Sequence, residues 1–256
     1  TFSITVSPAP TVTAPANQNV CAGQQTTSIN FSGTATTYSW TNDNPSIGLN
    51  TNGTADIVSF TATNTTTTPQ IATIVVTPTY TNNGISCTGP SKTFTITVNP
   101  VAEVIQPTSL IRCNGDVANV NFISANTGGT TSYSWTNSTP SIGLGAAGVG
   151  NIGAFTGTNT GTTSQVATIV VTPTYTSGGV SCTGPSKSFT ITVNPSANVE
   201  QPTATVVCAN SPVSTIFNTT NTDGTTTYSW TNNNTAIGLN ASGNGSIPTF
   251  TALNSG

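Results

Sequence analysis

The amino-acid sequence predicts an all-β protein built from tandem β-sandwich repeats of about 95 residues. Three observations carry this prediction. Trp40, Trp135 and Trp230 lie 95 residues apart. The phrase CTGPSKTFTITVNP at 87–100 returns as CTGPSKSFTITVNP at 182–195. The segments between turns alternate apolar and polar positions with the period of a strand, and β-branched residues dominate them.

Within one repeat, short strands are expected to follow one another. The segment at 28–32 keeps its apolar residues in phase, and in the next segment Trp40 shares a face with the tyrosine two positions before it. Residues 70–80 form a longer apolar run, typical of a strand in the middle of a sheet. Pro78 interrupts that run, so we expect a bulge or the end of the strand there. Residues 93–98 place Phe, Ile and Val on one face and Thr on the other.

Turn residues separate these strands. Asn83-Gly84 and Gly178-Gly179 are two-residue hairpin signals, because both positions of such a turn need positive φ. About seven short strands, a central Trp and two distant Cys in each repeat predict an immunoglobulin-like sandwich. The tryptophans are expected in the core of each sandwich: Trp40, Trp135 and Trp230.

Prolines mark the junctions between repeats. Residues 1–8 are expected to be the last strand of a preceding repeat, 9–100 and 101–195 two whole repeats, and 196–256 an incomplete repeat that lacks its last strands. The chain is therefore expected to be part of a longer array. The next apolar segment follows each junction without a Gly/Ser linker, so the joints are expected to be short and stiff.

One loop changes length between repeats. Phe31 and Tyr38 are seven positions apart, whereas Phe122 and Tyr133 are eleven apart. Insertions usually collect in exposed loop tips, where no buried backbone hydrogen bond is lost. We therefore expect an exposed loop that tolerates changes.

Five cysteines predict structural disulfides. Cys21 and Cys87 lie 66 residues apart and Cys113 and Cys182 lie 69 apart, which predicts one disulfide within each whole repeat. Cys208 then has its partner outside this chain, with a free reactive thiol as the alternative. Each bridge would stabilise its repeat by roughly 4 kcal/mol on the chain-entropy model. Disulfides persist in oxidising compartments, so the array is expected outside the cytoplasm.

The composition excludes several classes of function. Only 3 residues are Lys or Arg and 6 are Asp or Glu, so no basic patch for nucleic acid or an anionic membrane is expected. The sequence has no run of eighteen apolar residues, and we expect no membrane insertion in this segment. With no His, Ser and Cys nucleophiles lack their commonest base. The carboxylates do not recur between repeats, so neither an enzyme, a cofactor nor a repeating calcium site is expected.

The recurring series Cys…Phe…Tyr-Ser-Trp…Cys-Thr-Gly-Pro…Phe-Thr-Ile-Thr-Val-Asn-Pro resembles the PKD-like, immunoglobulin-like tandem repeats of large Bacteroidota cell-surface proteins and adhesins. The resemblance covers every segment of the chain. It implies an extracellular or cell-surface location, association with type IX secretion, and no catalytic residues. PKD domains proper carry an FGDG-type motif after the Trp; here TND, TNS or TNN follows, so no role tied to that motif is implied.

The function expected from these features is a stiff extracellular stalk or filament, in which the partners of each repeat are its neighbours in the same chain. One alternative is a fibre subunit that self-assembles with other copies through repeat contacts, because few charges protect the edge strands. Another is a carbohydrate-binding module that touches surface glycans through the variable loop or through the hairpins near Tyr80 and Tyr175. The other aromatics recur with the repeat and are expected in the cores.

Overall fold

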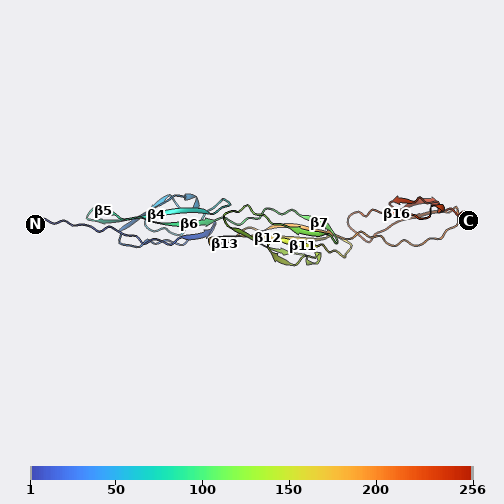
Figure 1. The fold of residues 1–256 in the computed structure, drawn as a ribbon, viewed down its shortest axis with the longest axis horizontal. Coiled ribbons are helices and arrows are strands. Elements are labelled where there is room, and N and C mark those ends of the chain that lie inside the picture. The colour runs from blue at the N-terminus through green and yellow to red at the C-terminus, as the bar shows by residue number, and fades with distance from the viewer. Residues whose placement is uncertain (1, 255–256) are drawn as a thin grey trace.

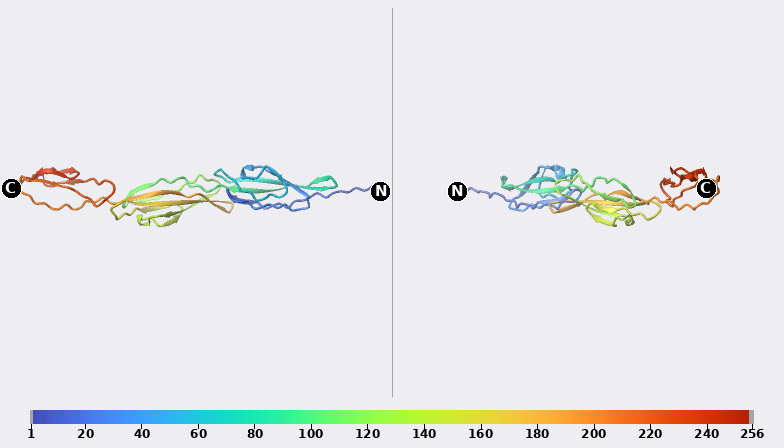
Figure 2. Two further views of the ribbon diagram at one scale, coloured as in Figure 1. Left: turned by 180° about the vertical axis from the view of Figure 1, so that it is seen from behind. Right: turned by 45° about the vertical axis from the view of Figure 1, so that its right-hand side comes forward.

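The computed structural model describes residues 2–254, which form a row of three units along one long axis with the two ends of the chain at opposite ends of the row (Figure 1). Views from other sides show the same extended arrangement (Figure 2). Among the described residues, the helical pieces are three single 3-10 turns: η1 (Pro45–Ile47), η2 (Pro140–Ile142) and η3 (Thr235–Ile237). None is long or apolar enough to cross a membrane. The predicted all-β class, with tandem immunoglobulin-like sandwich repeats, is confirmed.

The first repeat contains one large sheet in the order β1-β6-β4-β2-β3, with β5 paired to the far end of β4. Neighbouring strands are antiparallel, except that β1 runs parallel to β6. The central strand β4 is 13 residues long, and alternate side chains along it are buried, as the pleat requires. The strands are β1 (Gln18–Cys21), β2 (Thr37–Asn42), β3 (Asn52–Thr54), β4 (Gln70–Asn82), β5 (Ile85–Thr88) and β6 (Lys92–Asn99).

The second repeat builds the same sheet in the order β10-β9-β12-β14-β7, with β13 paired to β12. Its strands are β7 (Leu110–Cys113), β9 (Thr130–Asn137), β10 (Ala147–Val149), β12 (Gln165–Ser177), β13 (Val180–Thr183) and β14 (Lys187–Asn194). A smaller layer of β8 (Val117–Val120) and β11 (Ile152–Thr156) faces this sheet. In the first repeat, isolated bridges such as Ile29 to Ile57 take its place.

A separate hydrophobic core lies between the layers of each whole repeat. Buried residues between Val12 and Val98 make up the first core, and buried residues between Val104 and Val193 make up the second. Trp40 and Trp135 are buried in them, 7% and 8% exposed, as expected. Each whole repeat can therefore bury its own apolar surface.

A glycine stands directly opposite each tryptophan. Trp40 pairs with Gly53 and Trp135 with Gly148 in the β2–β3 and β10–β9 ladders. A Cβ on Gly148 would lie 2.3 Å from the Trp135 ring, so only glycine leaves room for the indole to lie over the neighbouring strand. The same pair recurs as Trp230 and Gly243.

The third repeat is more open. Its strands form two separate pairs: β15 (Pro212–Thr215) with β18 (Ile247–Thr251), and β16 (Ser229–Thr231) with β17 (Ser242–Asn244). Trp230, expected in a core, is only half-buried. Residues 196–254 contain no strand equivalent to β4 or β6, and those strands supply much of the core in the other repeats.

The assignment of residues 1–8 to the last strand of a preceding repeat stays a prediction, whereas the expectation about Pro78 is corrected. Residues 2–8 form no paired strand, and Phe2, Ile4 and Val6 are 89%, 74% and 84% exposed; Thr1 lies outside the described residues. In β6, the equivalent residues pair with β1 and β4, and no described strand offers residues 2–8 such partners.

Pro78 neither ends β4 nor forms a bulge. On one side it pairs with Tyr38, and on the other β4 changes partner from β6 to β5 at this point. The Pro78 carbonyl accepts a hydrogen bond from the Gly89 amide at 3.0 Å on the side where the partner changes. The N–H that proline lacks would point to the side where β4 changes partner. Pro78 therefore removes no ladder hydrogen bond.

Candidate functional site: the joints between repeats

A disulfide joins the first repeat to the second. Cys21 at the end of β1 is bonded to Cys182 in β13, 161 residues further along the chain, with their Cα atoms 5.5 Å apart. The expected pairs Cys21–Cys87 and Cys113–Cys182 are therefore wrong. The thiols of Cys87, Cys113 and Cys208 are free.

The sheet register explains why a disulfide within the repeat cannot form. Cys87 stands opposite Tyr80 on β4, whereas Cys21 stands opposite Asn99, next to the pair of Val98 with Gln70. Positions 70 and 80 are ten residues apart on one strand, or about 33 Å at 3.3 Å per residue. A disulfide needs Cα atoms within about 7 Å. The two cysteines of one repeat thus lie at opposite ends of its sheet.

The β12–β13 hairpin of the second repeat reaches the end of the first repeat, where β13 is labelled in Figure 1. Gly178 and Gly179 form its turn with φ of 55° and 78°, as the sequence predicted for a two-residue hairpin. The Asn19 side chain donates hydrogen bonds to the carbonyls of Ser177 at 3.0 Å and Gly178 at 3.1 Å. The Asn99 amide also donates to the Ser177 carbonyl, at 3.0 Å.

Docking buries residues that are otherwise accessible. In the docked hairpin, Tyr175 is 0% exposed and Cys182 is 3% exposed. In the undocked β4–β5 hairpin of the first repeat, the equivalents Tyr80 and Cys87 are half-buried, and Ile85 is 67% exposed. The joint therefore has a desolvated centre as well as a covalent bond.

The loop of variable length belongs to the joint. In the second repeat, the Thr127 amide donates to the Thr67 carbonyl of the first repeat at 3.0 Å, and Gly128 approaches Pro69. The Tyr175 hydroxyl donates to the Thr127 carbonyl at 2.9 Å, which ties the loop to the docked hairpin. The tip of this loop, residues 127–130, is exposed as expected, but it is not free of contacts, because it reaches the neighbouring repeat.

The second joint repeats the loop contact. Thr222 donates to the Thr162 carbonyl at 3.1 Å, at positions 95 residues after Thr127 and Thr67. Asp223 accepts a hydrogen bond from the Ser164 amide at 2.7 Å, and this bond holds the pKa of the carboxyl below its ordinary value of 3.8. Asn114 adds a side-chain hydrogen bond to Ser196 Oγ at 3.0 Å.

Two asparagines of the first joint were not recognised in the sequence. Asn99 is fully buried, and Asn194 occupies its position in the second repeat. The available signal was an asparagine at the same position of both repeats, at the end of a strand with alternating apolar residues. Asn19 gave no such signal, because Ile111 stands at its position in the second repeat.

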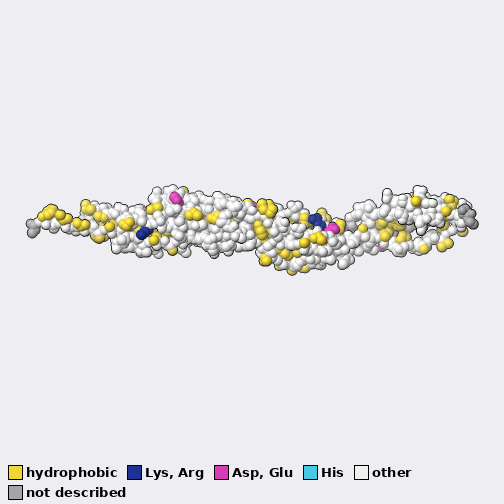
Figure 3. Space-filling view, in the orientation of Figure 1, with side chains coloured by type: hydrophobic (Ala, Val, Ile, Leu, Met, Phe, Trp, Pro, Cys, Tyr) yellow, Lys and Arg dark blue, Asp and Glu magenta, His cyan; other side chains and the backbone are white. Residues whose placement is uncertain are grey.

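Metal-ligating and charged groups are sparse in the part of the chain that the structure describes. Among the described residues, no three His, Cys, Asp or Glu side chains lie together as a metal site would require. Charged side chains are sparse on the face shown in Figure 3. Tyr175, considered as part of a sugar platform, is fully buried in the joint and cannot contact a sugar there.

Comparisons with known proteins give one family match and several similar solved structures. Residues 15–102 match the family model of the PKD-like domain. Similar solved structures include human CDH23 EC21-23 (12% identity, 97% of this chain and 92% of that chain, TM-score 0.44). Others are mouse Cadherin-23 EC22-24 (12% identity, 97% and 90%, TM-score 0.42) and the I9-I11 tandem from titin (8% identity, 96% and 90%, TM-score 0.31). No curated protein matches the chain.

Proposed function

We propose that this chain is a non-catalytic, stiff extracellular spacer: a stalk or filament segment of a bacterial surface protein that holds another part of that protein away from the cell. The observation that carries this proposal is the joint between the first and second repeats. A tandem array with flexible linkers would bend at every junction. Here a disulfide, three side-chain hydrogen bonds and a loop contact resist bending at one junction.

The disulfide supports the extracellular placement, because it requires an oxidising compartment to form and persist. The resemblance to PKD-like repeats of Bacteroidota surface proteins, including adhesins exported by the type IX system, is consistent with this placement.

The alternative of lateral self-assembly has weaker support. The strands at the edges of the large sheet are short, since β1 has 4 residues and β3 has 3. Short edges offer few unpaired backbone groups to another chain. For a carbohydrate-binding module, the half-buried Tyr80 is the remaining aromatic candidate in the hairpins, and one partly covered ring is a small platform.

Particle shape tests the proposal. Negative-stain electron microscopy of native surface material is expected to show single rows of beads, each row one sandwich wide. Small-angle scattering of the purified chain is expected to fit a rigid rod. Scattering of the Cys182→Ser variant, which lacks the covalent joint, is expected to fit a more flexible chain. A thicker, regular fibre would contradict the spacer and favour self-assembly. A bent, fluctuating chain with the disulfide intact would also contradict it.

A further inference from the structure

The second repeat carries a free end equivalent to the hairpin-binding end of the first repeat, with the Cys and the buried-strand Asn kept and Ile111 in place of Asn19. Cys113 is the last residue of β7 as Cys21 is of β1, and it stands opposite Asn194 as Cys21 stands opposite Asn99. The backbone next to these pairs also agrees. Ala22 donates to the Asn99 carbonyl and Asn114 to the Asn194 carbonyl, both at 2.9 Å.

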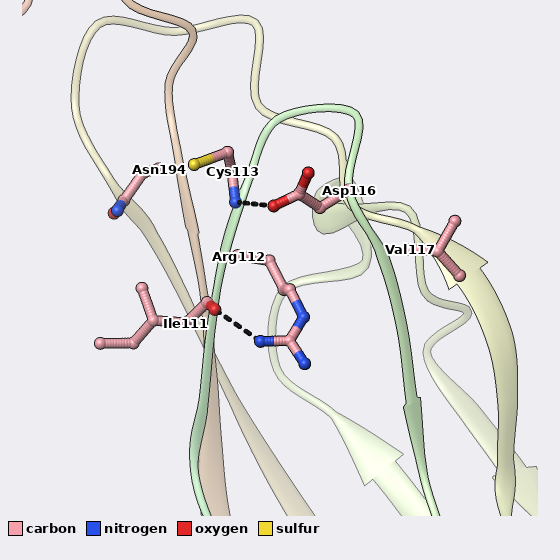
Figure 4. Close-up of a pocket in the computed structure, with 6 residues that line it drawn as sticks. All are labelled: Ile111, Arg112, Cys113, Asp116, Val117 and Asn194. Carbon is pink, nitrogen blue, oxygen red and sulfur yellow. Dashed lines mark hydrogen bonds between the residues drawn. The ribbon is translucent and has the colours of Figure 1, made fainter.

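The two ends differ in whether a hairpin is bound. At the first end, Asn99 is 0% exposed beneath the docked hairpin. At the second, Asn194 is half-buried, Cys113 is exposed and its thiol is free. An open pocket of about 410 Å³ lies there, lined by Ile111, Arg112, Cys113, Asp116, Val117 and Asn194. Figure 4 shows the Cys113 sulfur on the side of Asn194, with Arg112 and Asp116 directed away from it.

We propose that this pocket, the Cys113 site, binds the β-hairpin of the repeat that follows in the array and closes on it with a disulfide. The ligand is a hairpin of the type seen at 175–183, in which a Cys lies opposite a Tyr beside a two-residue turn. The bound copy in the first joint fixes the chemistry. Asn194 Nδ2 donates to the carbonyl before the turn, as Asn99 does to Ser177. The Cys113 thiol lies beside the cysteine of the bound hairpin, as Cys21 lies beside Cys182.

The source of the hairpin is set by the spacing. The hairpin bound at the first joint comes from the repeat that directly follows it, and the third repeat, from Ser196, already contacts the second repeat through Asn114 and Thr162. The third repeat thus already lies next to the Cys113 site, as the second repeat lies next to Cys21, and we take it as the source of the hairpin. The Cys87 hairpin of the first repeat is the undocked equivalent of the Cys182 hairpin.

Bond formation needs an oxidant, which we take to be a small-molecule disulfide such as oxidised glutathione. The Cys113 thiolate attacks it and forms a mixed disulfide, with release of one glutathione thiolate. The hairpin thiolate then attacks the Cys113 sulfur, forms the joint disulfide and releases the second glutathione thiolate. The two cysteines lose two electrons, glutathione disulfide gains them, and the two released protons balance the two thiolates.

The first test uses the 256-residue protein and a synthetic peptide of residues 77–90, which contains the Cys87 hairpin. The two are incubated in a glutathione redox buffer, the free thiols are alkylated, and the cross-links are mapped by mass spectrometry without reduction. Cys208 is the matched control, because it is also exposed and free but has no strand equivalent to β14 beside it. We expect about ten times as much peptide bonded to Cys113 as to Cys208. One to two net hydrogen bonds in the bound complex correspond to about that factor in affinity.

Two variants separate binding from simple thiol exposure. Asn194→Ala is expected to lower labelling at Cys113 and leave Cys208 unchanged. A peptide with Asn83→Ala and Gly84→Ala cannot form the turn and is expected to label both cysteines alike. Equal labelling of Cys113 and Cys208 by the native peptide would overturn the proposal.

The second test identifies the source. Residues 162–195 of this chain are appended after Gly256, which occupies the position of Gly161 in the repeat, so that the third repeat gains its hairpin. We expect the appended cysteine to pair with Cys113 in the same molecule. Pairing with Cys208, or only between molecules, would overturn the proposal. The inference extends the proposed spacer, but its tests measure disulfide connectivity and the spacer is tested by particle shape, so either can fail alone.

Discussion

Cys21 and Cys182 are bonded across the boundary between two repeats, although 161 residues separate them and each has another cysteine within its own repeat. The bond connects the end of one sandwich to the hairpin of the next. It therefore constrains how two independently folded units sit together, and the cores of the units do not depend on it. This distinction gives the first of four predictions.

Cys182→Ser is expected to loosen the joint and leave the cores intact. The amide of Thr127, which is hydrogen-bonded across the joint, should exchange with solvent about tenfold faster or more, because opening the joint no longer works against a covalent bond. Core amides such as that of Ile169 should keep their protection. Hydrogen exchange read by mass spectrometry measures both. Uniform loss of protection in one repeat would instead mean that the disulfide stabilises the fold of that repeat.

Asn99→Ala is expected to destabilise the docked joint by about 1 kcal/mol, because Asn99 is fully buried and donates to the Ser177 carbonyl. Asn194→Ala is the matched control at the same position of the second repeat, where no hairpin is bound. Its effect should be less than half as large. Denaturant unfolding with hydrogen exchange of the joint measures the difference, and equal effects would rule out a special role for the Asn99 hydrogen bond.

Gly148→Ala is expected to destabilise the second repeat by about 1–3 kcal/mol, the usual cost of overpacking a core. The new Cβ would lie 2.3 Å from the Trp135 ring, which must move or tilt. Gly153→Ala is the control, because nothing lies within 4 Å of its Cβ position, and it should change stability by less than about 0.5 kcal/mol. Tryptophan fluorescence during urea unfolding reports both. A neutral Gly148→Ala would mean that the indole moves at no cost.

The Ser164–Asp223 contact is expected to depend on pH. The hydrogen bond from the Ser164 amide holds the folded pKa of Asp223 below the ordinary value of 3.8. A lowered folded pKa means that the contact stabilises the joint above pH 3.8 and is lost as the pH falls through the folded value. Exchange protection of the Ser164 amide should therefore fall at acid pH.

Asp223→Asn keeps an acceptor oxygen but cannot titrate, so it is the control for this prediction. In this variant, protection of the Ser164 amide should lose its pH dependence below the ordinary pKa. If the native and variant proteins lose protection together, a different group controls the acid response.

Local features of the sequence were enough for the fold of one repeat. The alternation at 93–98 predicted β6, the turn residues Gly178-Gly179 predicted the hairpin, and the tryptophan interval predicted buried Trp40 and Trp135. These properties depend on the pleat, on positive φ and on burial, and each involves residues that are neighbours in the sequence or that repeat at a fixed distance. The half-buried Trp230 was the exception, because residues 196–254 contain no strand equivalent to β4 or β6 to cover it.

The pairing of the cysteines was not accessible in this way. Spacing along the chain says how far apart Cys21 and Cys87 are in sequence, but not that a 13-residue strand places them at opposite ends of a sheet. The contact of the variable loop was not accessible for the same reason, since the loop touches a neighbouring repeat that local sequence does not identify.

The sequence by itself determined the repeat, its β-strands and its turns, because period and turn chemistry act over a few residues. Only the tertiary structure decided how repeats join. The joint is formed where the end of one sheet meets the hairpin of the next, and which side chains meet there depends on strand length, register and direction together. Cys21, Asn99 and Cys182 become one site only when two complete sandwiches are placed end to end.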